Sequence, residues 1–154
     1  MKIRYNDYFK QIVKIEKEKV MVIIAGCIIE KDNKILMVKE SKKECYGKWN
    51  IPAGHVEEGE LITAGAIREI YEETGYKVKL TGTLPILCAT FEGKETRIMV
   101  RFTADVIEES NGYDTNEILD VQWIDMNDIK NMTEEELRGY DINMQTIKDF
   151  EAKN

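Results

Sequence analysis

The segment from Gly54 to Tyr76 constrains the fold more than any other part of the chain, because it places acids at helical spacing. Glu69, Glu72 and Glu73 stand at positions i, i+3 and i+4, and such positions lie about 5–6 Å apart on an α-helix. Like charges at that distance destabilise a helix unless a cation lies beside them. The spacing therefore predicts a helix whose acidic stripe binds a cation.

The same helix has an apolar side. At about 100° per residue, a mainly apolar stripe falls roughly opposite Glu69 and consists of Ala64, Ile67, Ile70, Tyr71 and Thr74. Such a stripe is typical of a helix packed on a core. Gly75 stands where the helix is expected to end, because glycine adopts the left-handed conformation without a Cβ penalty. The pattern predicts one buried face and one acidic face.

Carboxylate oxygens without an accompanying cluster of Cys or His suit hard divalent cations. Mg²⁺ is usually held by one or two carboxylates together with water and substrate phosphates. We therefore expect Mg²⁺, or else Mn²⁺, in preference to zinc. The alternative is an acidic helix face that is simply solvated, and the residues around the acids decide between the two.

The whole segment resembles the complete Nudix box. The fixed positions of that motif match Gly54, Glu60, Arg68, Glu69, Ile70, Glu72, Glu73, Gly75 and Tyr76. From average residue usage, such a match is expected on the order of 10⁻⁹ times per starting point. The preceding residues 49–53 also resemble the strand and turn that lead into the box. Ala53 departs from the pattern, since many members carry a second glycine there, but a backbone carbonyl can serve as a ligand from either residue.

The resemblance implies a role for most of these positions. It implies that the metal is bound by Glu69, Glu72, Glu73 and the backbone carbonyl of Ala53 or Gly54. Glu60 and Arg68 resemble the pair that fixes the loop against the helix in Nudix domains, where an arginine fork suits orientation more than chemistry. Gly54 and Gly75 support the loop and the helix end.

Two acids are candidates for activating the attacking water. Glu69 does so in some members of the family, and an acid from a downstream loop does so in others. Glu117 is the candidate for the second case, because it lies six residues ahead of Trp123, where the family often carries such a residue. For Glu117 the alternative is a solvated loop acid.

Four further side chains are candidates for substrate binding, namely Lys39, Arg101, Trp49 and Phe91. Lys39 and Arg101 lie on strands expected to border the cleft and could steer phosphates. Trp49 and Phe91 could stack on a base, although packing is the more common role of such side chains. His55, at a variable position of the box, is expected to make a loop or surface contact.

Composition supports one domain spanning residues 1–154, with residues 1–19 as an N-terminal extension. A chain of 154 residues, 43% hydrophobic, buries enough surface to fold without disulfides. The hydrophobic patterns predict strands at 20–30, 34–40, 48–51, 77–91, 96–108 and 121–124, a hairpin at 31–33 and a final helix at 142–151. The resemblance implies an α/β fold, an α/β/α sandwich with a mixed sheet.

Charge and cysteine content restrict the partners and the compartment. A net charge of −7 opposes binding to a nucleic-acid polymer, which favours a basic surface. Three cysteines without metal-type spacing indicate inert thiols and a reducing cytosol. The apolar run at 20–29 is too short for a bilayer, which takes about 20 residues. We expect a cytoplasmic protein without a membrane partner, and the sequence leaves a homodimer open.

The resemblance implies a metal-dependent hydrolase of phosphoanhydride bonds. The expected substrate is a nucleoside diphosphate or triphosphate, or a similar small nucleoside-diphosphate-linked compound, with phosphate or pyrophosphate as product. The proline typical of ADP-ribose enzymes and the tyrosine typical of diadenosine polyphosphate enzymes are both missing around residues 91–94. The alternatives are an ADP-ribose or nucleotide-sugar pyrophosphatase, a nucleotide-binding regulatory domain of the same fold, and a protein with a structural cation site.

Overall fold

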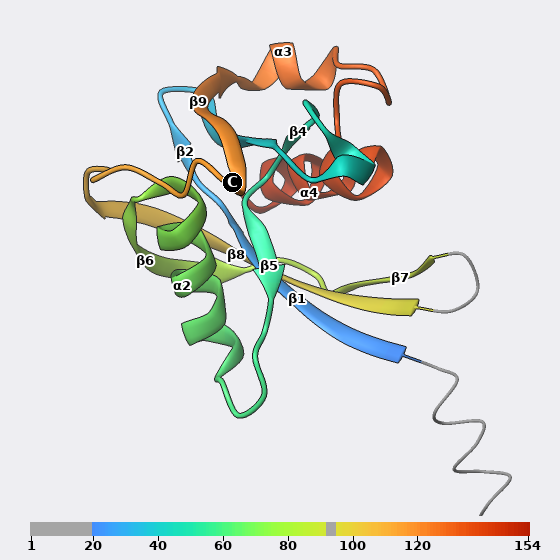
Figure 1. Cartoon of the computed structure of the whole chain (residues 1–154). Helices are drawn as coiled ribbons and strands as arrows, with labels where there is room; N and C mark the ends of the chain where they lie inside the picture. The colour runs from blue at the N-terminus through green and yellow to red at the C-terminus, as the bar shows by residue number, and fades with distance from the viewer. Residues whose placement is uncertain (1–19, 92–94) are drawn as a thin grey trace, which may run out of the picture.

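The computed structural model describes residues 20–91 and 95–154 (Figure 1). Strand β8 (Glu95–Glu108) organises the larger sheet and runs parallel to β1 (Val20–Ile28). Its other edge pairs antiparallel with β7 (Leu87–Phe91) and then with β6 (Lys77–Thr83). Strand β5 (Ala53–His55) adds antiparallel to the free edge of β1 and completes a mixed sheet.

A second group of strands surrounds β3 (Lys34–Glu40). It pairs antiparallel with β2 (Glu30–Lys31), β4 (Trp49–Asn50) and β9 (Ile118–Asp125). The hairpin between β2 and β3 turns at Asp32 and Asn33, whose φ angles of 54° and 62° are those a tight two-residue hairpin turn requires. This is the hairpin that the sequence predicts.

Helices cover the strands on two sides (Figure 1). Helix α2 (Ile62–Thr74) lies on one side, and α3 (Met126–Lys130) and α4 (Tyr140–Lys153) lie on the other. A short 3₁₀ turn, η1 (Lys43–Cys45), follows β3. None of the helices in the described residues is long and apolar enough to cross a membrane.

The alternation of side chains along β1 and β3 explains this layering. Cys27 and Leu36 pack with Ala66 and Ile70 of α2 in one core cluster. Ile28, Ile35 and Met37 pack in a second cluster with residues of α3 and α4, Ile129 and Ile147. Strands buried on both faces are expected to be continuously apolar, as both are. The predicted α/β/α sandwich with a mixed sheet is confirmed.

Several element boundaries differ from the sequence prediction. The strand predicted at 77–91 is broken around Pro85, since β6 ends at Thr83 and β7 begins at Leu87. Helix α4 begins at Tyr140, before the predicted start at residue 142, and Gly139 is its N-cap. All three cysteines are free, and burial raises the pKa of Cys27 to about 12. Residues 1–19 and 92–94 lie outside the described part.

Candidate active site

Helix α2 presents its carboxylates differently from the sequence expectation. Its buried residues are Gly65, Ala66, Ile70, Glu73 and Thr74. Ile67 and Tyr71, which were expected to be buried, are exposed. The prediction of separate apolar and acidic faces is therefore wrong, because the buried face is turned by about one residue, roughly 100°, toward the acids. Small residues at 65 and 66 allow that approach, and they leave Glu73 buried and Glu72 exposed.

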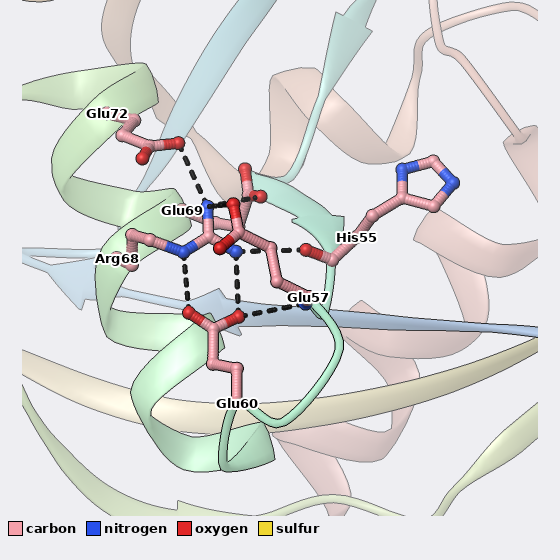
Figure 2. Close-up of polar contacts among 6 residues, drawn as sticks. All are labelled: His55, Glu57, Glu60, Arg68, Glu69 and Glu72. Atoms are coloured by element: carbon pink, nitrogen blue, oxygen red, sulfur yellow. Dashed lines mark hydrogen bonds and ion pairs between the residues drawn. The ribbon is translucent and has the colours of Figure 1, made fainter.

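Arg68 organises the acids on the outer side of α2 (Figure 2). Its guanidinium grips Glu60 with two hydrogen bonds, of 2.7 Å from Nε and 2.9 Å from a terminal nitrogen. The other terminal nitrogen donates to Glu69 at 2.9 Å and to Glu72 at 3.0 Å. The hydrogen bonds from Arg68, with one from the Glu57 backbone N–H, lower the pKa of Glu60 to about 2. The Glu60 pairing is the loop brace that the resemblance implies.

Glu73 lies deeper than the other acids of α2. Its Oε2 is buried and accepts no hydrogen bond from any described residue. Burial raises the pKa of Glu73 well above its usual range, and the neighbouring charges of Glu40 and Glu69 raise it further. Lys42 and a hydrogen bond from the Ala53 backbone N–H oppose that shift. A buried carboxylate oxygen without a partner is costly, and it suits a cation.

The backbone groups of the short strand β5 point alternately toward β1 and toward α2. Cys27 N–H donates to the Pro52 carbonyl at 3.3 Å, and Val56 N–H donates to the Ile23 carbonyl at 2.9 Å. Because paired residues alternate along an antiparallel ladder, Gly54 directs its backbone groups at Ala25 of β1. Ala53 and His55 direct theirs at α2, where the His55 carbonyl accepts from Arg68 at 3.0 Å. Of the two carbonyls open from the sequence, the one facing the acids belongs to Ala53.

Close approach of β5 to α2 explains Gly54. A Cβ at this position would lie 2.1 Å from the carboxyl carbon of Glu69, far inside van der Waals contact. Glu69 is half-buried, and burial raises its pKa while Arg68 lowers it. The charge of Glu117 also acts on Glu69 and raises the same pKa. Glu117 is exposed just before β9, and its carbonyl accepts from the Ser41 hydroxyl at 2.6 Å.

A second buried acid, Glu40, lies close enough to Glu73 for its charge to raise the Glu73 pKa. Only 2% of the Glu40 side chain is exposed, and its Oε1 accepts from Arg138 at 2.7 Å. Asn50 donates to the same oxygen at 3.1 Å. Asn143 of α4 donates to Asn50 at 2.9 Å and to the Arg138 carbonyl at 2.5 Å. This network ties the last residue of β3 to the beginning of α4.

A pocket of about 600 Å³ opens beside the acids. Its walls come from β1, β4, β5, β8 and the beginning of α4, and Ala53 and Gly54 form the wall that it shares with α2. The charged side chains in its lining are Lys42, Lys48, Arg97, Arg101, Arg138, Glu44 and Glu95. In a chain of net charge −7, a lining with five basic and two acidic side chains favours an anionic ligand.

His55 also lines this pocket. Its imidazole points away from Arg68, so that only its backbone joins the arginine network (Figure 2). Burial lowers the pKa of His55, and the positive charges of Lys42 and Arg97 lower it further. His55 therefore presents its imidazole, with a lowered pKa, to the pocket.

Comparison with known proteins agrees with this geometry. The sequence model of the NUDIX domain matches residues 20–143. The chain belongs to the Nudix family. A Nudix hydrolase of Nitrosomonas europaea superposes with a TM-score of 0.77 at 29% identity, covering 86% of this chain and 89% of that one. The MutT protein of Methanosarcina mazei has the same fold, with a TM-score of 0.72 at 22% identity over 89% of this chain and 97% of that one.

Two curated Nudix relatives carry named activities. The zebrafish (Danio rerio) 8-oxo-dGDP phosphatase is 42% identical over 59 residues, which is 38% of this chain and 18% of that protein. The ADP-ribose pyrophosphatase of Methanocaldococcus jannaschii is 34% identical over 105 residues, which is 66% of this chain and 60% of that protein. The match therefore covers less than a fifth of the zebrafish protein and about three fifths of the archaeal one.

The side chains proposed for substrate binding in this Nudix chain do not gather in one place. Lys39 packs over the Trp49 ring, 5.4 Å from its centroid, and neither residue lines the pocket. Trp49 packs on the core cluster beneath α4. Arg101 does reach the pocket, but it is 5% exposed and donates to Asp149 at 2.6 Å, to Thr146 at 2.9 Å and to the Pro85 carbonyl. These contacts brace β8 against α4. Phe91 ends β7, and its side chain lies outside the described part.

Two functional candidates escaped the sequence analysis, namely Glu40 and Arg138. The burial of Glu40 could have been predicted. Side chains alternate along a strand, so Glu40 lies on the same face of β3 as the buried residues Leu36 and Val38. The contact of Arg138 could not have been predicted, because Arg138 reaches Glu40 from 98 residues away.

Proposed function

We propose that this chain is a divalent-metal-dependent hydrolase that cleaves a phosphoanhydride bond in a small nucleotide. The observation that carries the proposal is the position of Glu73. Its buried, unpartnered Oε2 lies behind the same strand, β5, that walls a pocket with a mainly basic lining. An unsatisfied carboxylate beside an anion-attracting pocket suits a cation and a phosphate chain together.

Glu69, Glu72, Glu73 and the Ala53 carbonyl are the groups that would hold the metal, and Mg²⁺ or Mn²⁺ fits an all-oxygen set. As the side chains stand, no three His, Cys, Asp or Glu within the described residues are grouped closely enough to hold an ion, and Arg68 holds Glu69 and Glu72. When bound, such an ion stabilises charge on phosphoryl oxygens and acidifies a water. The unpartnered Oε2 of Glu73 supports this donor set.

The chain's own residues supply orientation and proton transfer. Arg68 fixes the direction of the Glu69 carboxylate with a 2.9 Å hydrogen bond. Glu69 or Glu117 accepts the proton of the attacking water, and the influence of the Glu117 charge on Glu69 supports their sharing one site. The pocket excludes water around the nucleoside part of the substrate and holds its phosphates toward β5.

The proposed substrate is a nucleoside diphosphate or triphosphate. The identity to the 8-oxo-dGDP phosphatase supports this class. The second candidate is ADP-ribose or a nucleotide sugar, which the longer alignment with the ADP-ribose pyrophosphatase favours. Cytoplasmic location, the single domain and a homodimer stay predictions.

The test is an assay of the full chain with Mg²⁺ against dGDP, 8-oxo-dGDP, ATP and ADP-ribose. Products separate the candidates, because a nucleoside diphosphate yields phosphate and a nucleoside monophosphate, whereas ADP-ribose yields AMP and ribose 5-phosphate. EDTA is expected to abolish turnover, and so is Glu73→Gln, with the circular dichroism spectrum retained. Glu58→Gln, at an exposed position of the loop before α2, is the matched control. Equal turnover in the wild type and Glu73→Gln would reject the proposal.

A further inference from the structure

Arg138 lies where the pocket meets the buried acids. It lines the pocket, it pairs with the buried Glu40, and its guanidinium feels the charge of Glu73. Arg138 is therefore a cation that both lines the pocket and lies near an acid proposed to bind the metal. Lys42 also lines the pocket and acts on Glu73.

Three of the four other basic side chains that line the pocket already have polar partners. Arg101 is bound to Asp149 and Thr146, and its Nε, which has no partner among the described residues, is buried. Arg97 pairs with Glu95 at 2.5 Å, and Lys48 donates to the Glu134 carbonyl at 2.8 Å. Lys42 is exposed on a flexible stem.

The Arg138 guanidinium is both anchored and incompletely used. One terminal nitrogen is held by Glu40, and the described residues provide no hydrogen-bond partner for its other donors. Its side chain keeps 29% of its surface exposed, whereas its carboxylate partner keeps 2%. A guanidinium fixed on one edge presents its remaining N–H groups in a rigid fork, which matches the oxygens of a phosphate. Anchoring also reduces the side-chain entropy lost on binding.

We propose that Arg138 binds the phosphate chain of the substrate and that Glu40 is its positioning residue. The inference rests on the proposed function for the identity of the ligand as a nucleotide, but the binding of phosphate can be measured without turnover. Glu40 does not touch the substrate. It acts by holding the guanidinium at the pocket end of β3, with Asn50 completing its hydrogen bonds.

The direct test is calorimetric titration of the full chain with inorganic pyrophosphate in EDTA. Removing Arg138 alone would leave Glu40 buried and unpaired, so the matched pair is Glu40→Gln and the double variant Glu40→Gln/Arg138→Gln. In both of these variants the buried charge is gone, and only the guanidinium differs. We expect the double variant to bind pyrophosphate about tenfold more weakly than Glu40→Gln, in line with loss of a charge-assisted hydrogen bond.

Lys130→Gln is the control for the change in net charge, because Lys130 pairs with Glu151 and does not line the pocket. It is expected to bind within about twofold of the wild type, since surface pairs contribute little. Equal pyrophosphate affinity in Glu40→Gln and the double variant would overturn the proposal. So would wild-type affinity in the double variant, since Arg138 would then serve only as a counter-ion.

The positioning role of Glu40 is tested by comparing Glu40→Gln with Glu40→Met. Glutamine retains an oxygen that accepts from Arg138, and methionine does not. We expect pyrophosphate affinity within about threefold of the wild type for glutamine and a loss of about tenfold for methionine, with the melting temperature recorded for each. Equal affinity in the two variants would remove Glu40 from the assignment.

Steady-state kinetics then separates this inference from the proposed function. On the best nucleotide of the panel, the double variant is expected to raise KM about tenfold while kcat changes less than threefold, because a contact made equally in ground and transition states affects KM alone. A wild type that hydrolyses no nucleotide would refute the proposed function, and the pyrophosphate titration would still decide the role of Arg138. A wild type that turns over normally with no change in KM for the double variant would refute the inference alone.

Discussion

Two arginines bind carboxylates whose charges act on Glu73, and they reach those carboxylates in different ways. Arg68 contacts Glu60, Glu69 and Glu72, all within eight residues of itself in sequence. Arg138 reaches Glu40 across 98 residues. The first network is encoded in a local motif, whereas the second exists only after β3, β4 and α4 have assembled. The Arg68 contacts could therefore be inferred from sequence spacing, whereas the Arg138 contact required the fold.

The largest expected effect on turnover comes from Glu73, for which no hydrogen bond to either arginine is observed among the described residues. Glu73→Gln should reduce turnover by about a thousandfold or more, since it removes a proposed metal ligand. The metal ion would stabilise the charge of the transition state by several kcal/mol. The metal-free protein should not lose stability, because an amide is less costly to bury than a carboxylate without a partner. Turnover assays and thermal unfolding in EDTA measure the two effects. A fall in both together would show that Glu73 has a packing role instead.

Arg68→Lys should have the next largest effect on turnover, and it tests the contacts that Arg68 makes within its own motif. Lysine keeps the charge but cannot grip Glu60 with two parallel hydrogen bonds and hold Glu69 as well. We expect turnover to fall about 30- to 100-fold, a loss comparable with misplacing a catalytic group by about 1 Å. Steady-state kinetics with Mg²⁺ measures this change. If Arg68→Lys keeps more than half of the wild-type turnover, orientation by the arginine fork is unimportant.

Glu117→Gln should lower turnover by more than about tenfold, since a general base usually contributes about 100- to 10,000-fold. Glu117 is exposed, so the melting temperature should not change. Glu58→Gln provides the control, since Glu58 is exposed too and has no assigned role. Wild-type turnover in Glu117→Gln would leave Glu69 as the base.

The sequence predicted the loop and helix around Arg68 well, because their contacts join residues that are close together in the sequence. The carboxylate positions, the Glu60 and Arg68 pairing and the Gly75 helix end all depend on residues within one loop and helix. The orientation of α2 was wrong, because packing of Ala66 and Ile70 against β1 and β3 decides which face is buried, and angular counting along one helix contains no such information. The ion pair of Arg101 could not be predicted for a similar reason, since its partner Asp149 lies on a helix whose position the sequence does not reveal.

The smallest expected effect is a change in stability at low pH, and it concerns the Arg68 network. The pKa of Glu60 is lowered to about 2 from 4.5, so the folded state prefers the ionised form more than the unfolded state does. The stability from this pairing is therefore fully present above about pH 4.5 and is lost as the pH falls toward about 2. Glu60→Gln should remove that part of the acid dependence, which urea unfolding at pH 5 and pH 3 can measure. Glu58→Gln should retain the wild-type difference between the two pH values, because this exposed acid has no such partner among the described residues. An unchanged difference in Glu60→Gln would mean that the Arg68 network contributes to orientation of the acids and not to stability.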